Sequence, residues 1–541
     1  NTTGSGGNVA VYDSTDFYLG ASTINGNLEV ETGNVSAANI GDDGIVTVTG
    51  TTDLSASGTN NANVASIWMS NYSHVFSGAV SAQGHHVRIK FGGATELGTI
   101  RAKRGKVEIT STGALTQSGP IQANTDTTIS ASGQNITLNN TSNSFGGNSN
   151  ATITSTNVSS GDEIKLTGAN VEVTSDHSFN VGTSTVSGNL TLTSGSAQNG
   201  DGNFGIIDTS NVTVGGNFSA TTNANNGAID MGTLLVDGTI ALATHGSGNA
   251  TVVNDNGLNF AASTVGGALN ATATIGSMTD TGALTVTGTT TLVTSANDAS
   301  ITLDQGGHAF TGALLITTND TGTDTAGDVT ISAGSGAALD FGNSTIDGDL
   351  IATSSNTTGI TDSGALTVRG TSSFQTTATD ADISLGTSTL GDGNGTDTIT
   401  FNTTGSGGNA TLDNGTTAIV LGTSAASLAT SVGGDLTLQT GHASGITDSA
   451  TVTVGRNLSA RTDANNGVIT LDSLAVDGTI TLTTNDDANN DSAHATIVNT
   501  CSVCSHGLNF AASTVEGNLS ATATTGNIIQ SGALTIKGTS A

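Results

Sequence analysis

The chain has 541 residues, of which 75 are glycine, one is proline, 10% are charged and 3% are aromatic. This composition excludes an ordinary globular enzyme, and 34% hydrophobic residues spread along the whole chain argue against disorder. The formal net charge of -32 predicts a surface that repels nucleic acid and anionic lipid.

The chain starts in repetitive sequence, because residues 1–8 recur without change as residues 402–409. No basic-then-apolar export signal is visible at the start, and no apolar run has the length of a membrane span. We therefore expect a processed protein or a piece of a larger one. Neither end resembles a polar cap, which predicts unpaired strand edges at both ends.

A basic and aromatic stretch lies at residues 68–106, within a divergent first region that we place at residues 1–180. It holds six of the eleven Lys and Arg residues of the chain. Aromatic and Arg residues are favoured at the centre of interfaces. The predicted binding patch consists of Trp68, Tyr72, Arg88, Lys90, Arg101, Lys103, Arg104 and Lys106. Its partner would be a glycan or the acidic flank of a second copy, and the alternative is a chance cluster in a variable region. The same stretch also contains His74, Phe76, His85, His86 and Phe91.

The second region, residues 181–541, is built from long repeats of roughly 72–86 residues. Their anchors are Val214, Val286, Val368, Val454 and Ile536. A shorter motif recurs inside each long repeat: an aliphatic residue, any residue, Gly, a small polar residue and a second aliphatic residue. Examples begin at Val186, Val236, Ile346, Val432 and Val515. The spacing of the anchors gives a basic coil of about 21–22 residues.

Apolar and polar residues alternate around each motif, as in Leu190-Thr-Leu192, and Gly, Asn and Asp end each run after three to five residues. Short strands, tight turns and a repeated coil predict an all-β fold, a right-handed parallel β-helix (β-solenoid). Phe218, Phe310 and Phe374 replace aliphatic residues of the motif, so we expect them to stack inside the coils. Thr and Asn at matched positions should form side-chain ladders.

Two further features could bind metal or form a covalent link. Cys501 and Cys504 project from a five-residue insertion, where a local disulfide is the main interpretation and a metal half-site with His506 the alternative. Asp-rich loops lie at residues 320–328, 391–397 and 486–491 and follow no known calcium-binding spacing. Weak Ca²⁺ binding is the one cofactor interaction we allow, and solvated turns are the simpler interpretation.

The Gly-Asn-Leu coils and the Ser-Gly-Ala-Leu-Thr-Val modules resemble repeats of filamentous haemagglutinin-like exoproteins, secreted by two-partner systems. The resemblance implies a secreted right-handed β-helix that serves as an adhesin, toxin stalk or matrix component. The family's secretion domain usually carries Asn-Pro-Asn motifs, whereas the one proline here, Pro120, follows Gly119. That domain is therefore not expected in this chain.

We expect no enzymatic activity, because the Lys and Arg residues after position 106 are widely scattered and give no cluster of carboxylates with basic residues. Irregular coil lengths also disfavour a flat ice-binding array. The sequence predicts an extracellular structural solenoid that assembles head to tail with itself into a filament, sheath or matrix. The alternative is the stalk of a large secreted adhesin that binds glycans.

Overall fold

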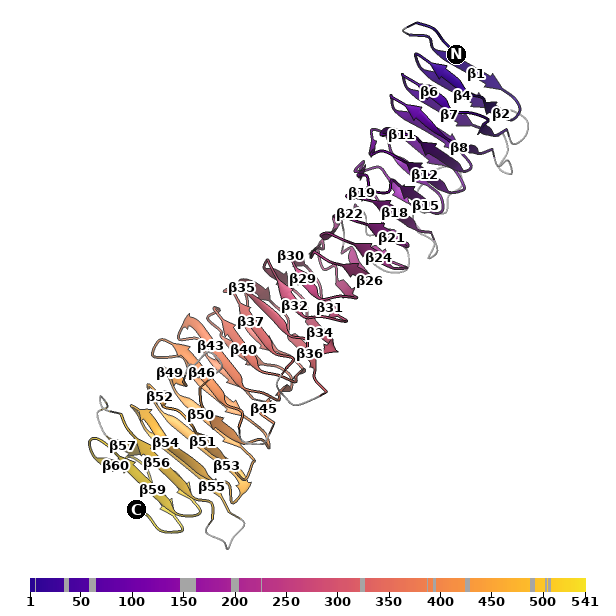
Figure 1. Cartoon of the computed structure of the whole chain (residues 1–541). Helices are drawn as coiled ribbons and strands as arrows, with labels where there is room; N and C mark the ends of the chain where they lie inside the picture. The colour runs from indigo at the N-terminus through magenta and orange to yellow at the C-terminus, as the bar shows by residue number, and fades with distance from the viewer. Residues whose placement is uncertain are drawn as a thin grey trace. The chain divides into compact units, whose positions relative to one another are not determined.

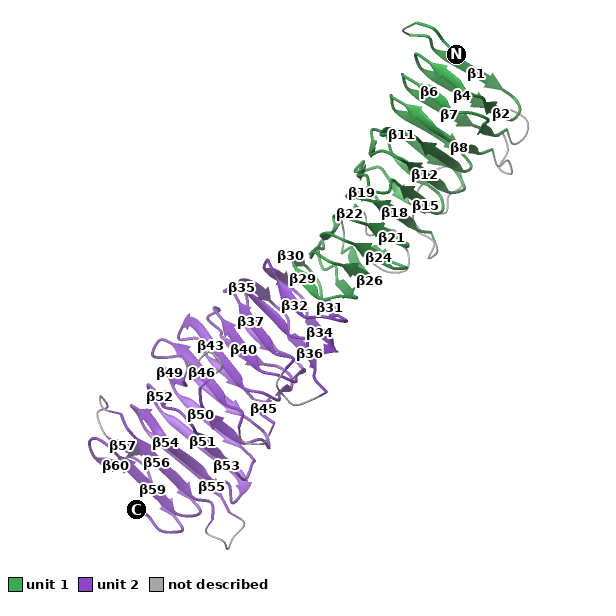
Figure 2. Ribbon diagram, in the orientation of Figure 1, with its two compact units in different colours: residues 1–268 green, residues 269–541 purple. Residues whose placement is uncertain are grey.

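The structure is a computed structural model that describes residues 1–4, 6–33, 38–57, 65–145, 162–195, 204–224, 226–321, 326–386, 388–392, 396–423, 429–486, 492–501, 504 and 507–541. Every regular element among them is a β-strand, from β1 (Val9–Asp13) to β61 (Leu534–Ile536) (Figure 1). The chain forms two compact units, residues 1–268 and 269–541 (Figure 2). The predicted change in sequence regularity at residue 180 is a different kind of boundary and stays a prediction.

Each unit is a stack of parallel strands, so the predicted parallel β-solenoid is confirmed. In unit 1, β10 (Val87–Phe91) pairs with β12 (Val107–Ser111), and Val87 lies beside Val107 of the next coil. In unit 2, β37 (Val329–Ala333) pairs with β40 (Leu350–Ser354), and Val329 lies beside Leu350. Longer coils occur where loops are inserted, as between Thr127 and its register partner Ile164. The predicted coil of about 21–22 residues is thus the compact form of a repeat whose loops vary in length.

Every coil crosses two sheets, which we call sheet A and sheet B. One crossing is usually a single strand of about five residues, and the other is a pair of three-residue strands. In unit 2, the single strand β37 lies in sheet A, and the pair β38 (Leu339–Phe341) and β39 (Ser344–Ile346) lies in sheet B. Seven sheet crossings after β37, the single strand and the pair have exchanged sheets. The single strand β47 (Ala410–Asp413) is in sheet B, and the pair β48 (Ile419–Leu421) and β49 (Ser431–Val432) is in sheet A.

This exchange is regular. From β56 (Ala495–Asn499) onward, the single strand of each coil is again in sheet A. In unit 1 the coils that start at β1 have their single strand in sheet A, those from β10 have it in sheet B, and those from β19 (Val171–Ser175) have it in sheet A again. The long repeat seen in the sequence therefore makes three and a half turns. Within each unit, equivalent residues of successive long repeats lie on opposite sheets.

The core of each unit is the inward face of these strands. The motif residues Val186, Val236, Ile346, Val432 and Val515 are all at most 1% exposed. Phe218, Phe310 and Phe374 are buried as predicted, and the rings of Phe374 and Phe401 stack with centroids 5.9 Å apart. Stacking of like residues in neighbouring coils follows from the parallel register.

The Gly-Asn-Leu motif has a structural explanation at the turn before the single strand. Asn170 Oδ1 accepts a hydrogen bond from Asn189 N at 3.0 Å, and Asn189 Oδ1 accepts one from Asn217 N at 2.9 Å. A Cβ atom at Gly188 would collide with Asn170, and one at Gly216 would collide with Asn189. The Gly provides space for the Asn of the preceding coil, and the Asn ladder satisfies backbone groups at the turn.

Candidate functional site

Three basic residues and two histidines of the 68–106 stretch gather where two consecutive coils turn from sheet A into sheet B. In the first coil, His85 and His86 join β9 (Val80–Gly84) to β10. In the second, residues 103–106 join β11 (Thr95–Ala102) to β12. We call this surface the basic corner and define it by His85, His86, Lys103, Arg104 and Lys106.

A side chain of the first turn binds the backbone of the second. His86 Nδ1 accepts a hydrogen bond from Lys106 N at 2.9 Å. A Cβ atom at Gly105 would collide with the His86 ring, so glycine is required for this close approach. The His85 and His86 rings meet edge to face with centroids 4.3 Å apart. The basic corner is therefore an ordered surface of stacked turns.

An exposed aromatic side chain borders the corner on sheet B. Trp68 on β8 (Ile67–Phe76), Arg88 on β10 and Glu108 on β12 are consecutive register partners. The Trp68 indole is 41% exposed, and its centroid is 5.7 Å from that of His86. Arg88 Nε lies 3.0 Å from Glu108 Oε2. Together with Lys106 these side chains line a cavity of about 80 Å³, too small for a drug-sized ligand but adjacent to an open aromatic face.

The charge of the corner is set by its neighbours. The hydrogen bond from Lys106 Nζ to Asp126 Oδ2, 2.7 Å long, and the charge of Asp126 raise the pKa of Lys106. Burial lowers the pKa of both His85 and His86. The charges of His86 and Arg104 lower the pKa of His85 further. For His86, the charge of Glu108 raises the pKa and that of Lys106 lowers it. Both histidines are therefore neutral at pH 7, so the positive charge comes from Arg and Lys. Such a surface can bind an anionic or sugar ligand through cations and one aromatic face.

The structure brings together only part of the predicted binding patch. Trp68, Arg88, Lys103, Arg104 and Lys106 lie at or beside the basic corner. Tyr72, 41% exposed, and half-buried Lys90 lie further along the strands of sheet B.

Arg101 does not share that surface. It lies on sheet A, between Gln83 on β9 and Gln122 on β14 (Ile121–Ala123). A single run of basic residues thus divides between two faces, because the chain turns a corner after Ala102.

Three aromatic side chains of this stretch are in the core instead of on the surface. His74 is 0% exposed, and Phe76 and Phe91 are also buried. His74 Nε2 lies 3.1 Å from Asp42 Oδ2, and His74 Nδ1 accepts a hydrogen bond from Val46 N at 3.1 Å.

Unit 2 repeats this arrangement, which sequence reasoning missed. His308 Nε2 lies 3.1 Å from Asp280 Oδ2, and His308 Nδ1 accepts from Leu284 N at 2.9 Å. The available signal was the shared spacing in His74-Val-Phe76 and His308-Ala-Phe310, which places His and Phe on the same inward face.

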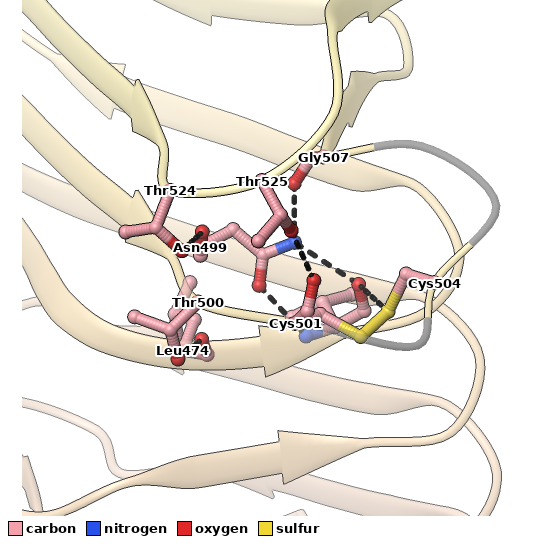
Figure 3. The surroundings of a disulfide bond; sticks show 9 residues. Leu474, Asn499, Thr500, Cys501, Cys504, Gly507, Thr524 and Thr525 are labelled. Carbon is pink, nitrogen blue, oxygen red and sulfur yellow. Dashed lines mark hydrogen bonds between the residues drawn. A yellow bond between two sulfur atoms is a disulfide. The ribbon is translucent and has the colours of Figure 1, made fainter.

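Cys501 and Cys504 are joined by a disulfide beside a buried asparagine (Figure 3). Asn499 Oδ1 accepts from Val476 N at 2.9 Å, and Asn499 Nδ2 donates to Gly507 O at 2.7 Å. Thr525 Oγ1 donates to Cys501 O at 2.6 Å, so the next coil also holds the start of this loop. His506, the third ligand of the alternative metal half-site, is outside the described residues.

The Asp-rich loops are described in part. Asp320 N donates to Asp347 Oδ2 at 3.0 Å, and Asp392 N donates to Asp397 Oδ2 at 3.0 Å. Asp324, Asp487 and Asp491 are outside the described residues. Among those that the structure describes, no group of three His, Cys, Asp or Glu side chains is placed to hold a metal ion. Ca²⁺ binding stays a prediction. The described part of the chain also contains no helix able to cross a bilayer.

Comparison with known proteins gives one family match, to a model described as repeats of unknown function (DUF5649). It covers residues 6–83, 84–152, 247–317, 326–389 and 493–541, more than half of the chain. No curated protein and no solved structure matches. Four matched segments begin shortly before the single strands β10, β28 (Ala250–Asn254), β37 and β56, so the family repeat starts where the single strand changes sheet.

Proposed function

We propose that this chain, which belongs to the DUF5649 family of repeats, is an extracellular structural β-solenoid that assembles head to tail with further copies of itself. The family description assigns no activity. The proposal therefore depends on the chemistry of the coil surfaces, above all on the last coil of unit 2.

That coil leaves inward-facing apolar side chains uncovered. Ile528 on β60 (Ile528–Gln530) lies over Leu508, which is 1% exposed, yet Ile528 itself is 51% exposed. On β61, Ile536 lies over the fully buried Val515 and is half-buried. These side chains line a hollow of about 620 Å³ with Phe510 and Leu519. A further parallel coil, supplied by a second copy or by further chain, would bury them and pair the outer edges of both strands.

The first coil of unit 1 has the strand order that such a contact needs. It begins with the single strand β1 in sheet A, followed by the short strands β2 (Phe17–Leu19) and β3 (Ser22–Ile24) on the sheet B side. The last coil of unit 2 likewise has a single strand, β59 (Leu519–Ala523), in sheet A and the pair β60 and β61 in sheet B. Single strand would meet single strand and pair would meet pair, which is a heterologous contact that propagates.

A second candidate function is the stalk of a secreted adhesin, as the resemblance to filamentous haemagglutinin-like proteins implies. The basic corner favours it, since Trp68 offers an exposed ring beside Arg88 and Lys106 in a chain of net charge -32. A glycan array probed with the wild-type chain and with Trp68→Ala tests this candidate. Binding that is unchanged in the variant would exclude the basic corner as the glycan site.

Head-to-tail assembly is tested with two lysine substitutions on the last coil, Ile528→Lys and Thr535→Lys. Both add one positive charge, but Ile528 faces inward while Thr535 faces solvent. Negative-stain microscopy and static light scattering should show axial assemblies for wild type and Thr535→Lys and their loss for Ile528→Lys. A wild-type chain that stays monomeric at high concentration would refute the proposal.

A further inference from the structure

We propose that the outer face of sheet A in unit 1 is a lateral docking surface for a second copy of this chain, bound antiparallel across a two-fold axis. This surface is separate from the coil ends. It lies on the six strands β1, β4 (Leu28–Thr32), β7 (Thr52–Ala56), β9, β11 and β14.

The centre of this face is a single column of side chains with opposite charges near its two ends. The parallel register places its six members side by side on consecutive strands. In order they are Tyr12, Glu31, Ser55, Gln83, Arg101 and Gln122. All six point outward, because their strand neighbours Val11, Val30, Leu54, Ala82, Ile100 and Ile121 point inward.

A second copy turned end for end complements this column. With the two-fold axis in the interface, parallel to the strands and midway between β7 and β9, β4 faces β11 of the second copy and β7 faces β9. Glu31 then faces Arg101, Ser55 faces Gln83, and Tyr12 faces Gln122. Each contact occurs twice because the interface is isologous. A parallel arrangement would instead place Glu31 against Glu31, which is repulsive.

In the neighbouring column, the two-fold rotation also brings complementary side chains opposite each other. Glu29 and Asp53 are exposed on β4 and β7, and Ser81 and Thr99 lie on β9 and β11. The same rotation sets Asp53 opposite Ser81 and Glu29 opposite Thr99, so each carboxylate meets a hydroxyl donor. These four residues, with Glu31, Ser55 and Gln83, line one hollow of about 420 Å³.

Glu29 is partly satisfied within one copy, because Tyr12 Oη donates to Glu29 Oε1 at 2.9 Å. Two local features show that the other charges on this face are less well satisfied within the described part of one copy. Arg101 Nε is buried and has no hydrogen-bond partner there. Burial and the adjacent Glu29 and Glu31 raise the pKa of Asp53, which shows that the three carboxylates crowd one another. A guanidinium from a second copy would relieve this crowding.

The size of the surface predicts the strength of the contact. Six strands at about 4.8 Å spacing and five residues at about 3.3 Å give a footprint of roughly 400 Å² for each copy. That is about half of a standard interface, so the contact should be weak and reversible.

The test is a charge exchange, made in the Ile528→Lys chain so that end contacts do not contribute. Sedimentation velocity should show a monomer–dimer equilibrium up to about 200 µM. Glu31→Arg alone and Arg101→Glu alone should each weaken dimerisation roughly tenfold, because each removes two symmetric attractions. The double variant Glu31→Arg/Arg101→Glu should restore it. Glu172→Arg, an exposed change of the same charge on β19 in sheet A, is the matched control and should leave dimerisation unchanged.

Three results would overturn the proposal: a chain that is monomeric over the whole concentration range, single variants that dimerise like the parent, or a double variant that dimerises no better than the single ones. Circular dichroism of each variant checks that the fold is retained, since Glu31 is exposed and Arg101 is half-buried. Loss of axial assembly in Ile528→Lys with this dimer retained would support both contacts. Axial assembly without a charge-dependent dimer would support the end contact and refute the lateral one.

Discussion

The segments that follow Val236 in unit 1 and Val476 in unit 2 share a buried asparagine but differ in loop length. Asn254 Oδ1 accepts from Val236 N at 2.8 Å, and its Nδ2 donates to Gly257 O at 2.6 Å, three residues on. Asn499 makes the same two bonds with Val476 N and Gly507 O, at 2.9 Å and 2.7 Å, but Gly507 lies eight residues on. The coil therefore fixes the bonds that face the core and leaves the length of the outer loop free.

The largest expected effect is the loss of this asparagine. Asn254→Leu leaves the backbone N–H and C=O of Val236 and the C=O of Gly257 without a protein partner. Buried groups left in this way cost about 1–3 kcal/mol each, so roughly 3 kcal/mol or more is expected. Asn499→Leu should cost the same, because its bonds are equivalent.

A long solenoid opens locally, so hydrogen exchange is the suitable measurement. Protection should fall roughly 100-fold in β26 (Ala228–Val236) and β28 (Ala250–Asn254) for Asn254→Leu, and equally in β54 (Ile469–Val476) and β56 for Asn499→Leu. Asn256→Leu is the control, because Asn256 is exposed in the same loop. Clearly unequal losses at the two asparagines would contradict the equivalence.

The sequence predicts the coils and their anchors but not these asparagines. The matching segments Ala250-Thr-Val-Val-Asn254 and Ala495-Thr-Ile-Val-Asn499 show alternation, in which Asn takes the place of an apolar residue. Composition alone suggests a solvated turn at Asn, and only the register reveals the backbone group beneath it. The exchange of sheets after three and a half turns is hidden for a similar reason: alternation looks the same whichever sheet a strand joins.

The sequence predicts which kinds of residue form the candidate site, but it does not predict which of them lie side by side. Trp68 and Arg88 lie side by side because β8 and β10 are in register, a relation that needs the coil length at that point. Arg101 leaves this surface because the corner falls after Ala102. His74 belongs to the same basic and aromatic stretch, but its position two residues before buried Phe76 places it on the inward face.

The buried histidines provide a titratable counterpart to the asparagines and the second prediction. Burial lowers the pKa of His74 and of His308, although Asp42 raises the first and Asp280 and Asp304 raise the second. Each ring therefore stays neutral to a lower pH in the folded chain than in the unfolded chain. Below the unfolded pKa, near 6.5, the unfolded chain binds protons that the folded chain does not, so stability falls as the pH falls.

The limiting slope is about 1.4 kcal/mol per pH unit for each histidine. Between pH 7 and pH 5, exchange protection should therefore fall in β8 and in β35 (Ile301–Phe310), while the coils of Asn254 and Asn499 change less. His308→Gln should remove the pH dependence in β35 and leave that of β8 intact. A pH dependence of β35 that survives the substitution would assign it to the carboxylates instead.

The smallest effect is expected from making the two loops alike. Replacing residues 500–506 by Asp-Asn gives unit 2 the short loop that joins Asn254 to Gly257 in unit 1. The first backbone bond of the loop should remain, because Thr500 N and Asp255 N both donate to the equivalent carbonyls of Leu474 and Leu234 at 2.7 Å. The exchange removes the disulfide, which closes a short loop and stabilises by about 2 kcal/mol at most. Shortening the loop from seven residues to two returns about 1 kcal/mol of closure entropy.

The expected net loss is therefore about 1 kcal/mol, and protection in β54 and β56 should change less than about tenfold. The double variant Cys501→Ser/Cys504→Ser, which loses the disulfide but keeps the long loop, should be slightly less stable than the loop exchange. If the exchanged loop instead lost as much protection as Asn499→Leu, the long loop would be part of the structure that holds the coil. Asn499 would then not be sufficient to position this turn. The two segments would be alike in sequence but not in what stabilises them.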